Sequence, residues 1–200
     1  MRQAILNNLG FVTFVVITAT ISGYWTYRVE SFRANVAKAR MAETIPSGTV
    51  ATVVDVLDGD EVTVTVASGD TFGVRILGIK AFNHVANDPG IRIWGERAVS
   101  QLSRTIKGNK VTIEFTEFKK DSSRRLLAYL KHGEEDVGMA LVADGSALAY
   151  TKYPHAREPA YRTAQARAWK TRTGLWGSKE AAARGLALKD AWEAERQAKR

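Results

Sequence analysis

The residue types that could do chemistry gather in one short stretch of this 200-residue chain. Asp58 and Asp60 flank Gly59 in a tight turn between two alternating apolar runs. A third run carries Arg75 in its middle and ends in a polar loop at residues 78–83. Carboxylates hold hard cations, and guanidinium groups hold phosphate oxygens. The stretch therefore has residue types that suit chemistry on a phosphate.

Composition excludes several other kinds of site. The chain has no cysteine, which rules out disulfides, thiolate metal sites and thiol nucleophiles. No group of His, Asp and Glu has zinc-ligand spacing, and there is neither a glycine-rich phosphate loop nor a Ser-His-Asp set. The net charge of +8 favours an anionic partner, such as nucleic acid, anionic lipid or an acidic protein, or it serves solubility alone. Most of this excess follows Tyr150, where twelve Lys or Arg and five Asp or Glu give a net +7.

The turn, the arginine run and the polar loop together resemble the active-site frame of the staphylococcal nuclease (thermonuclease) family. The resemblance runs from about residue 48 to residue 176. It is carried by Trp-Gly-Glu-Arg-Ala at 94–98, Leu-Ala-Tyr at 127–129, Ala-Leu-Val at 140–142 with Gly145, Ala-Tyr at 149–150 and Gly-Leu-Trp at 174–176. It implies a calcium-dependent phosphodiesterase site. In such a site oxygen ligands hold the cation, one carboxylate activates the attacking water, and two guanidiniums hold the phosphate.

Four positions keep the residue type that the resemblance implies. Arg75 and Arg125 stand at the two catalytic arginine positions, although Arg124 replaces the glycine that is usual before the second. Asp60 stands at one metal-binding aspartate, and Asp58 stands at its acidic neighbour. The phosphate-binding side of the site and one side of the metal site are thus present in the sequence.

Two positions have lost their carboxylate. Lys80 stands at the second metal-binding aspartate, and Asn83 stands at the glutamate that acts as general base. At an effective dielectric of about 20, two like charges about 4 Å apart repel by roughly 4 kcal/mol, and a divalent ion doubles that figure. Asn83 accepts no proton at neutral pH, so water activation is lost as well. We therefore expect a vestigial site that has no intact catalytic set and binds no metal or cofactor. The alternative is a site that works as in the family, and it would bind Ca²⁺.

Lys80 has two alternative placements. It either fills the old metal position as a built-in cation paired with Asp60, or it points to solvent while Asp60 makes a turn contact. Three nearby residues are the candidates for rescuing the site. His84 is either a replacement base or a surface residue, and Glu96 is expected on the first turn of its helix, near the positive end of the helix dipole. Asp88 is the third.

The elements that must position these residues predict an α+β fold, a five-stranded OB-like β-barrel with three helices. Runs of period two between turn residues predict the strands, at residues 49–57, 61–67, 71–79, 110–118 and 124–131. Apolar residues at helical spacing predict the helices, at residues 91–106, 137–143 and 160–171.

The N-terminal region predicts a membrane anchor. Residues 3–27 contain no charge, and a helix over 9–27 is long enough to cross a hydrocarbon core of roughly 30 Å at about 1.5 Å per residue. Tyr24, Trp25 and Tyr27 end it as an aromatic belt would, and basic residues follow, so the soluble domain is expected on the cytoplasmic or the matrix side. A cleaved signal peptide is the alternative.

This interpretation divides the chain into five parts. Residues 1–8 are the N-terminal end, 9–27 the transmembrane helix, 28–47 a basic linker helix, 48–176 the nuclease-like domain and 177–200 a basic helical extension. Ser178 can cap the last helix, whose first turn carries Glu180. Because Trp192 is costly to leave in water, a partner-binding helix is favoured there over a solvated tail.

Three functions remain open. The first is a membrane-anchored pseudoenzyme, an accessory subunit of a membrane complex that contacts lipid and other subunits. Its location would be the mitochondrial inner membrane, or else a bacterial cytoplasmic membrane. The second is a calcium-dependent nuclease acting on DNA or RNA. The third is a nucleic-acid-binding module without cleavage, in which Tyr129, Tyr150 and Tyr153 stack on bases or serve as core and rim residues.

Overall fold

The computed structural model describes Tyr24, Thr26, Arg28, residues 45–116, Lys120 and residues 125–198. The chain divides into two compact units, Met1–Thr44 and Ile45–Arg200, and the second unit holds the site. The predicted transmembrane helix and basic linker helix lie almost wholly outside the described residues. Among the described ones, no helix is long and apolar enough to cross a bilayer.

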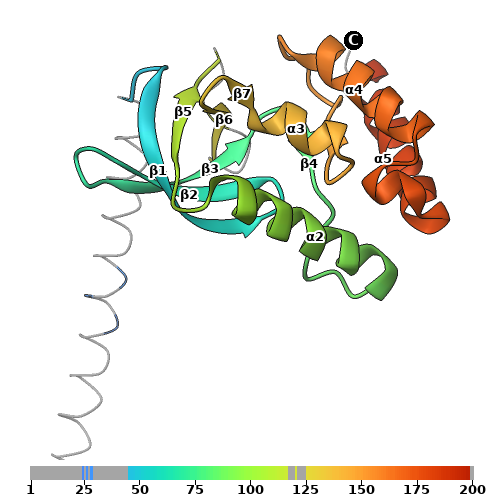
Figure 1. Cartoon of the computed structure of the whole chain (residues 1–200), viewed down its shortest axis with the longest axis horizontal. Coiled ribbons are helices and arrows are strands. Elements are labelled where there is room, and N and C mark those ends of the chain that lie inside the picture. The colour runs from blue at the N-terminus through green and yellow to red at the C-terminus, as the bar shows by residue number, and fades with distance from the viewer. Residues whose placement is uncertain are drawn as a thin grey trace, which may run out of the picture. The chain divides into compact units, whose positions relative to one another are not determined.

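Five strands form a mixed β-barrel, as the sequence predicts (Figure 1). They are β1 (Thr49–Asp58), β2 (Glu61–Val66), β3 (Thr71–Ile76), β5 (Lys110–Glu114) and β6 (Leu126–His132). Neighbours in the order β3-β2-β1-β5-β6 are antiparallel, and a parallel pairing of β3 with β6 closes the barrel. The short β7 (Glu135–Asp136) pairs with the end of β6.

Alternating apolar side chains fill the barrel. Along β2, Val62 and Val64 are fully buried, whereas Glu61, Thr63 and Thr65, which alternate with them, are partly exposed. Successive side chains of a strand point to opposite faces of the sheet. The alternation that predicts the strands is therefore the pattern that builds the core.

The third strand ends earlier than the sequence predicts. β3 stops at Ile76, and Gly78 turns the chain with a φ of 83°. The chain then forms β4 (Ile79–Lys80), which pairs with β8 (Leu148–Ala149) in a separate two-stranded sheet. A side chain at Gly78 would put its Cβ 2.5 Å from His155 Cε1, so this turn depends on glycine. Lys80 thus belongs to a second sheet and not to the barrel strand that carries Arg75.

Four α-helices lie in the described part of the chain. They are α2 (Pro89–Ile106), α3 (Val137–Ala143), α4 (Glu158–Lys170) and α5 (Lys179–Gln197), and a 3₁₀ helix, η1 (Gly174–Gly177), precedes the last. α2 begins before its predicted start, because Asp88 accepts hydrogen bonds at its N-terminus and Pro89 takes the first helical position. The prediction that Glu96 lies on the first turn is therefore wrong. Glu96 sits one turn further on and forms an ion pair with Arg92.

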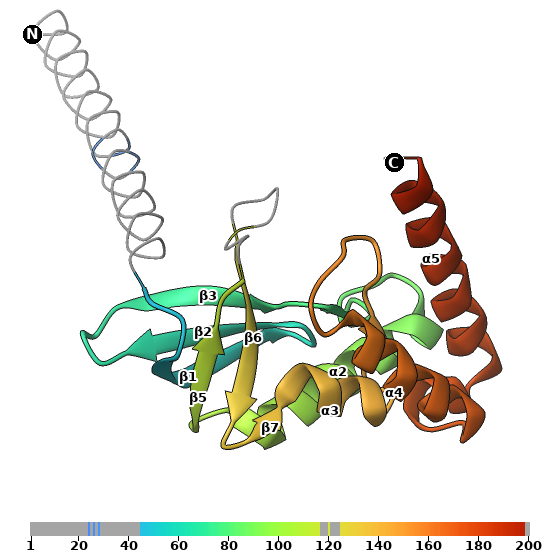
Figure 2. The ribbon, with the colours of Figure 1, turned by 90° about the horizontal axis from the view of Figure 1, so that it is seen from above.

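The predicted C-terminal helix is present as α5, and it packs on its own domain. Ser178 caps it by accepting a hydrogen bond from the backbone N of Ala181, as predicted. Trp192 is only 8% exposed and joins an apolar cluster that includes Phe82 and Trp176. α5 contacts η1 and α2, and Figure 2 shows it beside α4 at the helical end of the domain. The chain itself buries the Trp192 ring, so the exposed tryptophan that favoured a partner-binding helix is not present, and partner binding by this helix stays a prediction.

Candidate active site

A buried carboxylate forms the centre of the site. Asp60 is 1% exposed and lies in the turn after β1. Its Oδ2 accepts hydrogen bonds from Arg75 Nη2 and Lys80 Nζ, each 3.0 Å away, and from the backbone N of Ala81 at 3.2 Å. A buried charge is tolerated only when it is paired. The ion pair predicted between Lys80 and Asp60 is confirmed, and the alternative in which Lys80 points to solvent is wrong.

The barrel brings the second arginine to the same end. Arg125 immediately precedes β6, and the parallel pairing of β3 with β6 sets Arg75 opposite Leu127. Glu61 lies opposite Arg75 in the β2–β3 register, and its Oε2 accepts a hydrogen bond from Arg125 Nη1 at 3.3 Å. The two guanidiniums are thus linked through neighbouring carboxylates. We call Arg75, Lys80 and Arg125, with Asp60 and Glu61, the cation cluster.

The loop after β4 binds the other acidic residue of the turn. His84 Nδ1 lies 3.1 Å from Asp58 Oδ1, which also accepts a hydrogen bond from the backbone N of Gly59 at 2.8 Å. Asn83 Oδ1 accepts a hydrogen bond from the backbone two residues further on, at 2.8 Å, and so forms a turn within the loop. His84 is therefore the partner of Asp58, which the sequence did not predict.

Two tyrosines follow β8, the strand that pairs with the segment carrying Lys80. Tyr150 directly follows β8, the partner of the strand that carries Lys80, and its backbone N donates a hydrogen bond to the carbonyl of Gly78 at 2.8 Å. Burial raises the pKa of Tyr150 above its usual value, and the nearby charges of Lys152 and Arg75 partly oppose that rise. The rings of Tyr150 and Tyr153 lie 6.1 Å apart, and Tyr153 is half exposed. We call these two residues the tyrosine rim.

Comparison with known proteins agrees with this arrangement. The sequence model of the family described as staphylococcal nuclease homologue matches residues 73–178, which is more than half of the chain. The chain belongs to the staphylococcal nuclease family. A relative from Haemophilus influenzae, named an uncharacterized endonuclease, is 27% identical over 124 residues. The match covers 62% of this chain and 64% of that protein, so the chain spans less than two thirds of its relative.

The nuclease family implies a calcium ion, and the donor set here does not fit one. Asp60 Oδ1 is buried without a hydrogen-bond partner in the described structure, so it could face a cation. Its Oδ2, however, is held by a guanidinium and an ammonium. Ca²⁺ takes about six to eight oxygen ligands, and no group of three or more acidic or His residues in the described part of the chain could hold a metal ion. An ammonium beside the carboxylate repels a dication at close range.

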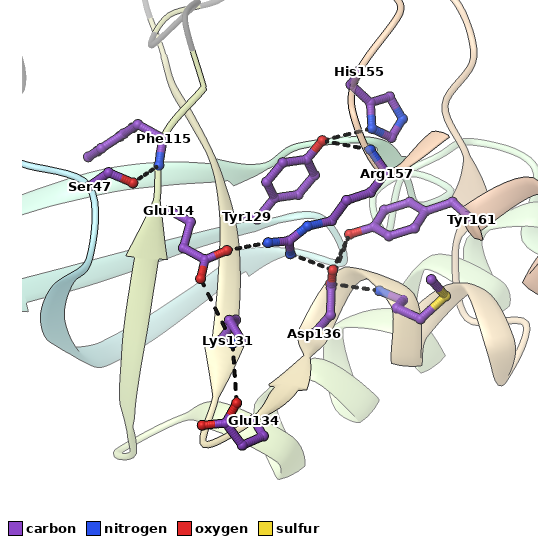
Figure 3. A network of polar contacts seen from close by, with 11 residues as sticks. Ser47, Glu114, Phe115, Tyr129, Lys131, Glu134, Asp136, His155, Arg157 and Tyr161 are labelled. Atoms are coloured by element: carbon purple, nitrogen blue, oxygen red, sulfur yellow. Dashed lines mark hydrogen bonds and ion pairs between the residues drawn. The ribbon is translucent and has the colours of Figure 1, made fainter. Parts of the chain in front are cut away.

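A second polar network joins the end of the barrel to the segment that leads into α4 (Figure 3). Tyr129 is buried, and its hydroxyl lies 2.9 Å from His155 Nδ1. Arg157 stacks on the Tyr129 ring, donates to Asp136 Oδ2 at 2.6 Å and contacts Glu114. Tyr129 therefore belongs to the core and is not available to stack on a base, whereas Tyr150 is half-buried and Tyr153 is half exposed.

The network joins residues that no short motif connects. Tyr161 donates to Asp136 Oδ1 at 2.8 Å, and burial raises the pKa of Tyr161 far above its usual value. Burial lowers the pKa of His155, and the charge of Glu158 partly opposes that effect. These residues come from β5, β6, β7, the segment before α4 and α4 itself. Because these residues are far apart in the sequence and form no motif, sequence reasoning had no local signal from which to predict the network.

Proposed function

We propose that this nuclease-family domain binds the phosphodiesters of single-stranded nucleic acid through the cation cluster and does not hydrolyse them by the calcium route. The observation that carries this proposal is the 3.0 Å contact between Lys80 Nζ and Asp60 Oδ2. It puts a protein cation against the carboxylate that the family uses for its metal. The nearby Asn83 supplies no base.

The charge of the cluster supports phosphate binding without a metal. Three cations face two carboxylates, which leaves a net +1. The side chain of Arg125 is 38% exposed, so this guanidinium reaches the solvent at the edge of the cluster. Guanidinium groups match phosphate oxygens in pairs of hydrogen bonds. Such a site retains the phosphate contacts of a nuclease while it lacks the means to activate water.

The test compares the full chain with a Lys80→Asp/Asn83→Glu variant. Labelled single-stranded DNA and RNA are incubated with calcium or with chelator, and calcium binding is measured by calorimetry. We expect oligonucleotide binding without chelator-sensitive cleavage, no calcium uptake by the unmodified chain, and calcium uptake by the variant. Arg125→Ala is the matched control for phosphate contact and should weaken binding alone.

A calcium-dependent nuclease is the second candidate. Membership of the family, the name of the Haemophilus relative and the retention of Asp60, Arg75 and Arg125 favour it. The free Oδ1 of Asp60 would then serve as a metal ligand after Lys80 moves away. Chelator-sensitive cleavage by the unmodified chain would establish this candidate and overturn the metal-free proposal.

An anchored, accessory role in a membrane complex is the wider setting that we propose. It rests on the uncharged residues 3–27 and the basic residues that follow. Carbonate extraction of membranes from expressing cells tests the anchor. The full chain should remain with the lipid, and a chain that begins at Ile45 should not. Release of the full chain by carbonate would contradict the proposed anchor, and with it the proposed role in a membrane complex.

A further inference from the structure

Helix α5 lies outside the region matched by the family, yet it contacts the rim of the site. The match ends at residue 178, and α5 covers Lys179–Gln197. The Trp192 ring meets the Tyr150 ring edge to face, with the centroids 4.7 Å apart and the planes at 82°. The helix therefore packs directly against the Tyr150 ring.

Polar contacts tie the same helix to the residues that follow Tyr150. Arg196 Nη1 donates to the carbonyl of Thr151 at 3.1 Å and to both carboxylate oxygens of Glu158, at 2.8 and 3.0 Å. Lys152 Nζ lies 2.5 Å from Glu195 Oε2. Glu158 is only 8% exposed, so Arg196 balances a charge that would be costly to bury alone. Residues 150–158 are thus held to α5 at both ends.

The held segment begins at the cation cluster. Leu148 pairs with Lys80, Ala149 pairs with Ile79, and Tyr150 bonds to the carbonyl of Gly78. Tyr150 is also close enough to Arg75 for that charge to act on the phenol. A change in the position of this segment would therefore move the tyrosine rim relative to the phosphate-binding groups.

We propose that α5 is a positioning element of the site, in which Trp192 and Arg196 hold the tyrosine rim beside the cation cluster. The inference rests on the proposed binding of single-stranded nucleic acid. A base next to the bound phosphate meets a rim whose rings are already ordered, so less conformational freedom is lost on binding. Trp192 and Arg196 touch no ligand in this scheme and act through Tyr150 and its neighbours.

The test uses the full chain with Trp192→Ala, Trp192→Phe and, as the matched control, Leu186→Ala, which removes an apolar side chain of the same helix from the same cluster. Hydrogen exchange of the amides in residues 150–157 is measured first. Trp192→Ala should speed their exchange, and Leu186→Ala should not. Affinity for a labelled oligothymidine is measured next. We expect a loss of about tenfold for Trp192→Ala, since stacking on one base contributes about that factor, and recovery in Trp192→Phe.

The outcomes separate this inference from the proposed function. Unchanged exchange in Trp192→Ala shows that α5 does not order the rim and overturns the inference. Faster exchange with unchanged affinity also overturns it, because α5 then only stabilises the fold. If the unmodified chain binds no oligothymidine, the proposed function fails, and the site role of α5 fails with it whatever the exchange shows.

Discussion

Asp60 shares one oxygen between Arg75 and Lys80 and keeps its other oxygen without a hydrogen-bond partner in the described structure. The two cations are not equivalent. The side chain of Arg75 is 12% exposed, whereas that of Lys80 is 30% exposed. Water can replace Asp60 as the partner of Lys80 more easily than it can for Arg75. We therefore expect the pair of Asp60 with Arg75 to stabilise the fold. The pair of Asp60 with Lys80 matters less for stability, and its expected effect is to keep a metal ion away from the carboxylate.

Two substitutions at the residue scale separate these roles. Asp60→Asn should destabilise the domain by about 3 kcal/mol, because it leaves a nearly buried guanidinium without its counter-ion. Lys80→Met should cost about 1 kcal/mol or less, because the ammonium is partly solvated and its pairing is screened. Urea unfolding of both variants measures the difference. Equal losses would contradict the view that Arg75, and not Lys80, depends on Asp60.

The pH dependence of stability should carry a contribution from His155. Burial lowers the pKa of His155 in the folded protein, so the unfolded chain binds this proton more readily. Stability from this group is present above the unfolded pKa of about 6.5 and is lost as the pH falls through the lowered folded pKa. The free energy of unfolding, measured from about pH 7 to 5, should depend less on pH in His155→Phe than in the unmodified chain. His132→Gln, which changes a partly exposed histidine, is the control, and an equal flattening there would contradict the assignment.

At the scale of elements, the turn between β3 and β4 sets the position of Lys80. Gly78→Ala combines a left-handed backbone with a Cβ 2.5 Å from the ring of His155. Gly108 has a similar φ of 80°, and a Cβ there would meet nothing within 4 Å. Gly108→Ala should therefore cost about 1 kcal/mol of backbone strain, and Gly78→Ala should cost about 2 to 3 kcal/mol more through overpacking. Urea unfolding tests this, and similar losses in the two variants would contradict it.

The same turn shows how far sequence reasoning reaches. The period-two runs predict all five barrel strands, and the resemblance places Asp60, Arg75 and Arg125 at one end of the barrel. The break at Gly78 is missed because Ile79 and Lys80 continue the alternating pattern, and their partner strand β8 lies almost seventy residues later. The size and apolar character of Trp192 predict that its ring is buried. They do not predict which residues bury it, because Tyr150 lies more than forty residues earlier in the sequence.

At the scale of the whole molecule, charge and site do not coincide. Most of the excess positive charge follows Tyr150, where several basic residues already hold acidic partners, as Arg157 does with Asp136 and Arg196 with Glu158. The cation cluster contributes only a net +1 and is built on the barrel. Nucleic acid could therefore meet either a compact site of three cations or a diffuse basic surface of the helices, and the salt dependence of binding distinguishes the two.

Binding through the cation cluster predicts a shallow salt dependence. For single strands, the logarithm of the affinity falls with the logarithm of salt by about 0.7 per neutralised phosphate, so three engaged cations give a slope of about −2. Fluorescence anisotropy of the full chain with a labelled oligonucleotide, across roughly 50 to 200 mM salt, measures this slope. Arg125→Ala should make it shallower by about 0.7. A Lys179→Ala/Arg184→Ala double variant, which removes two exposed charges of α5, should leave it unchanged. If the slope changed only in the double variant, we would conclude that nucleic acid binds to the C-terminal helix and not to the cation cluster on the barrel.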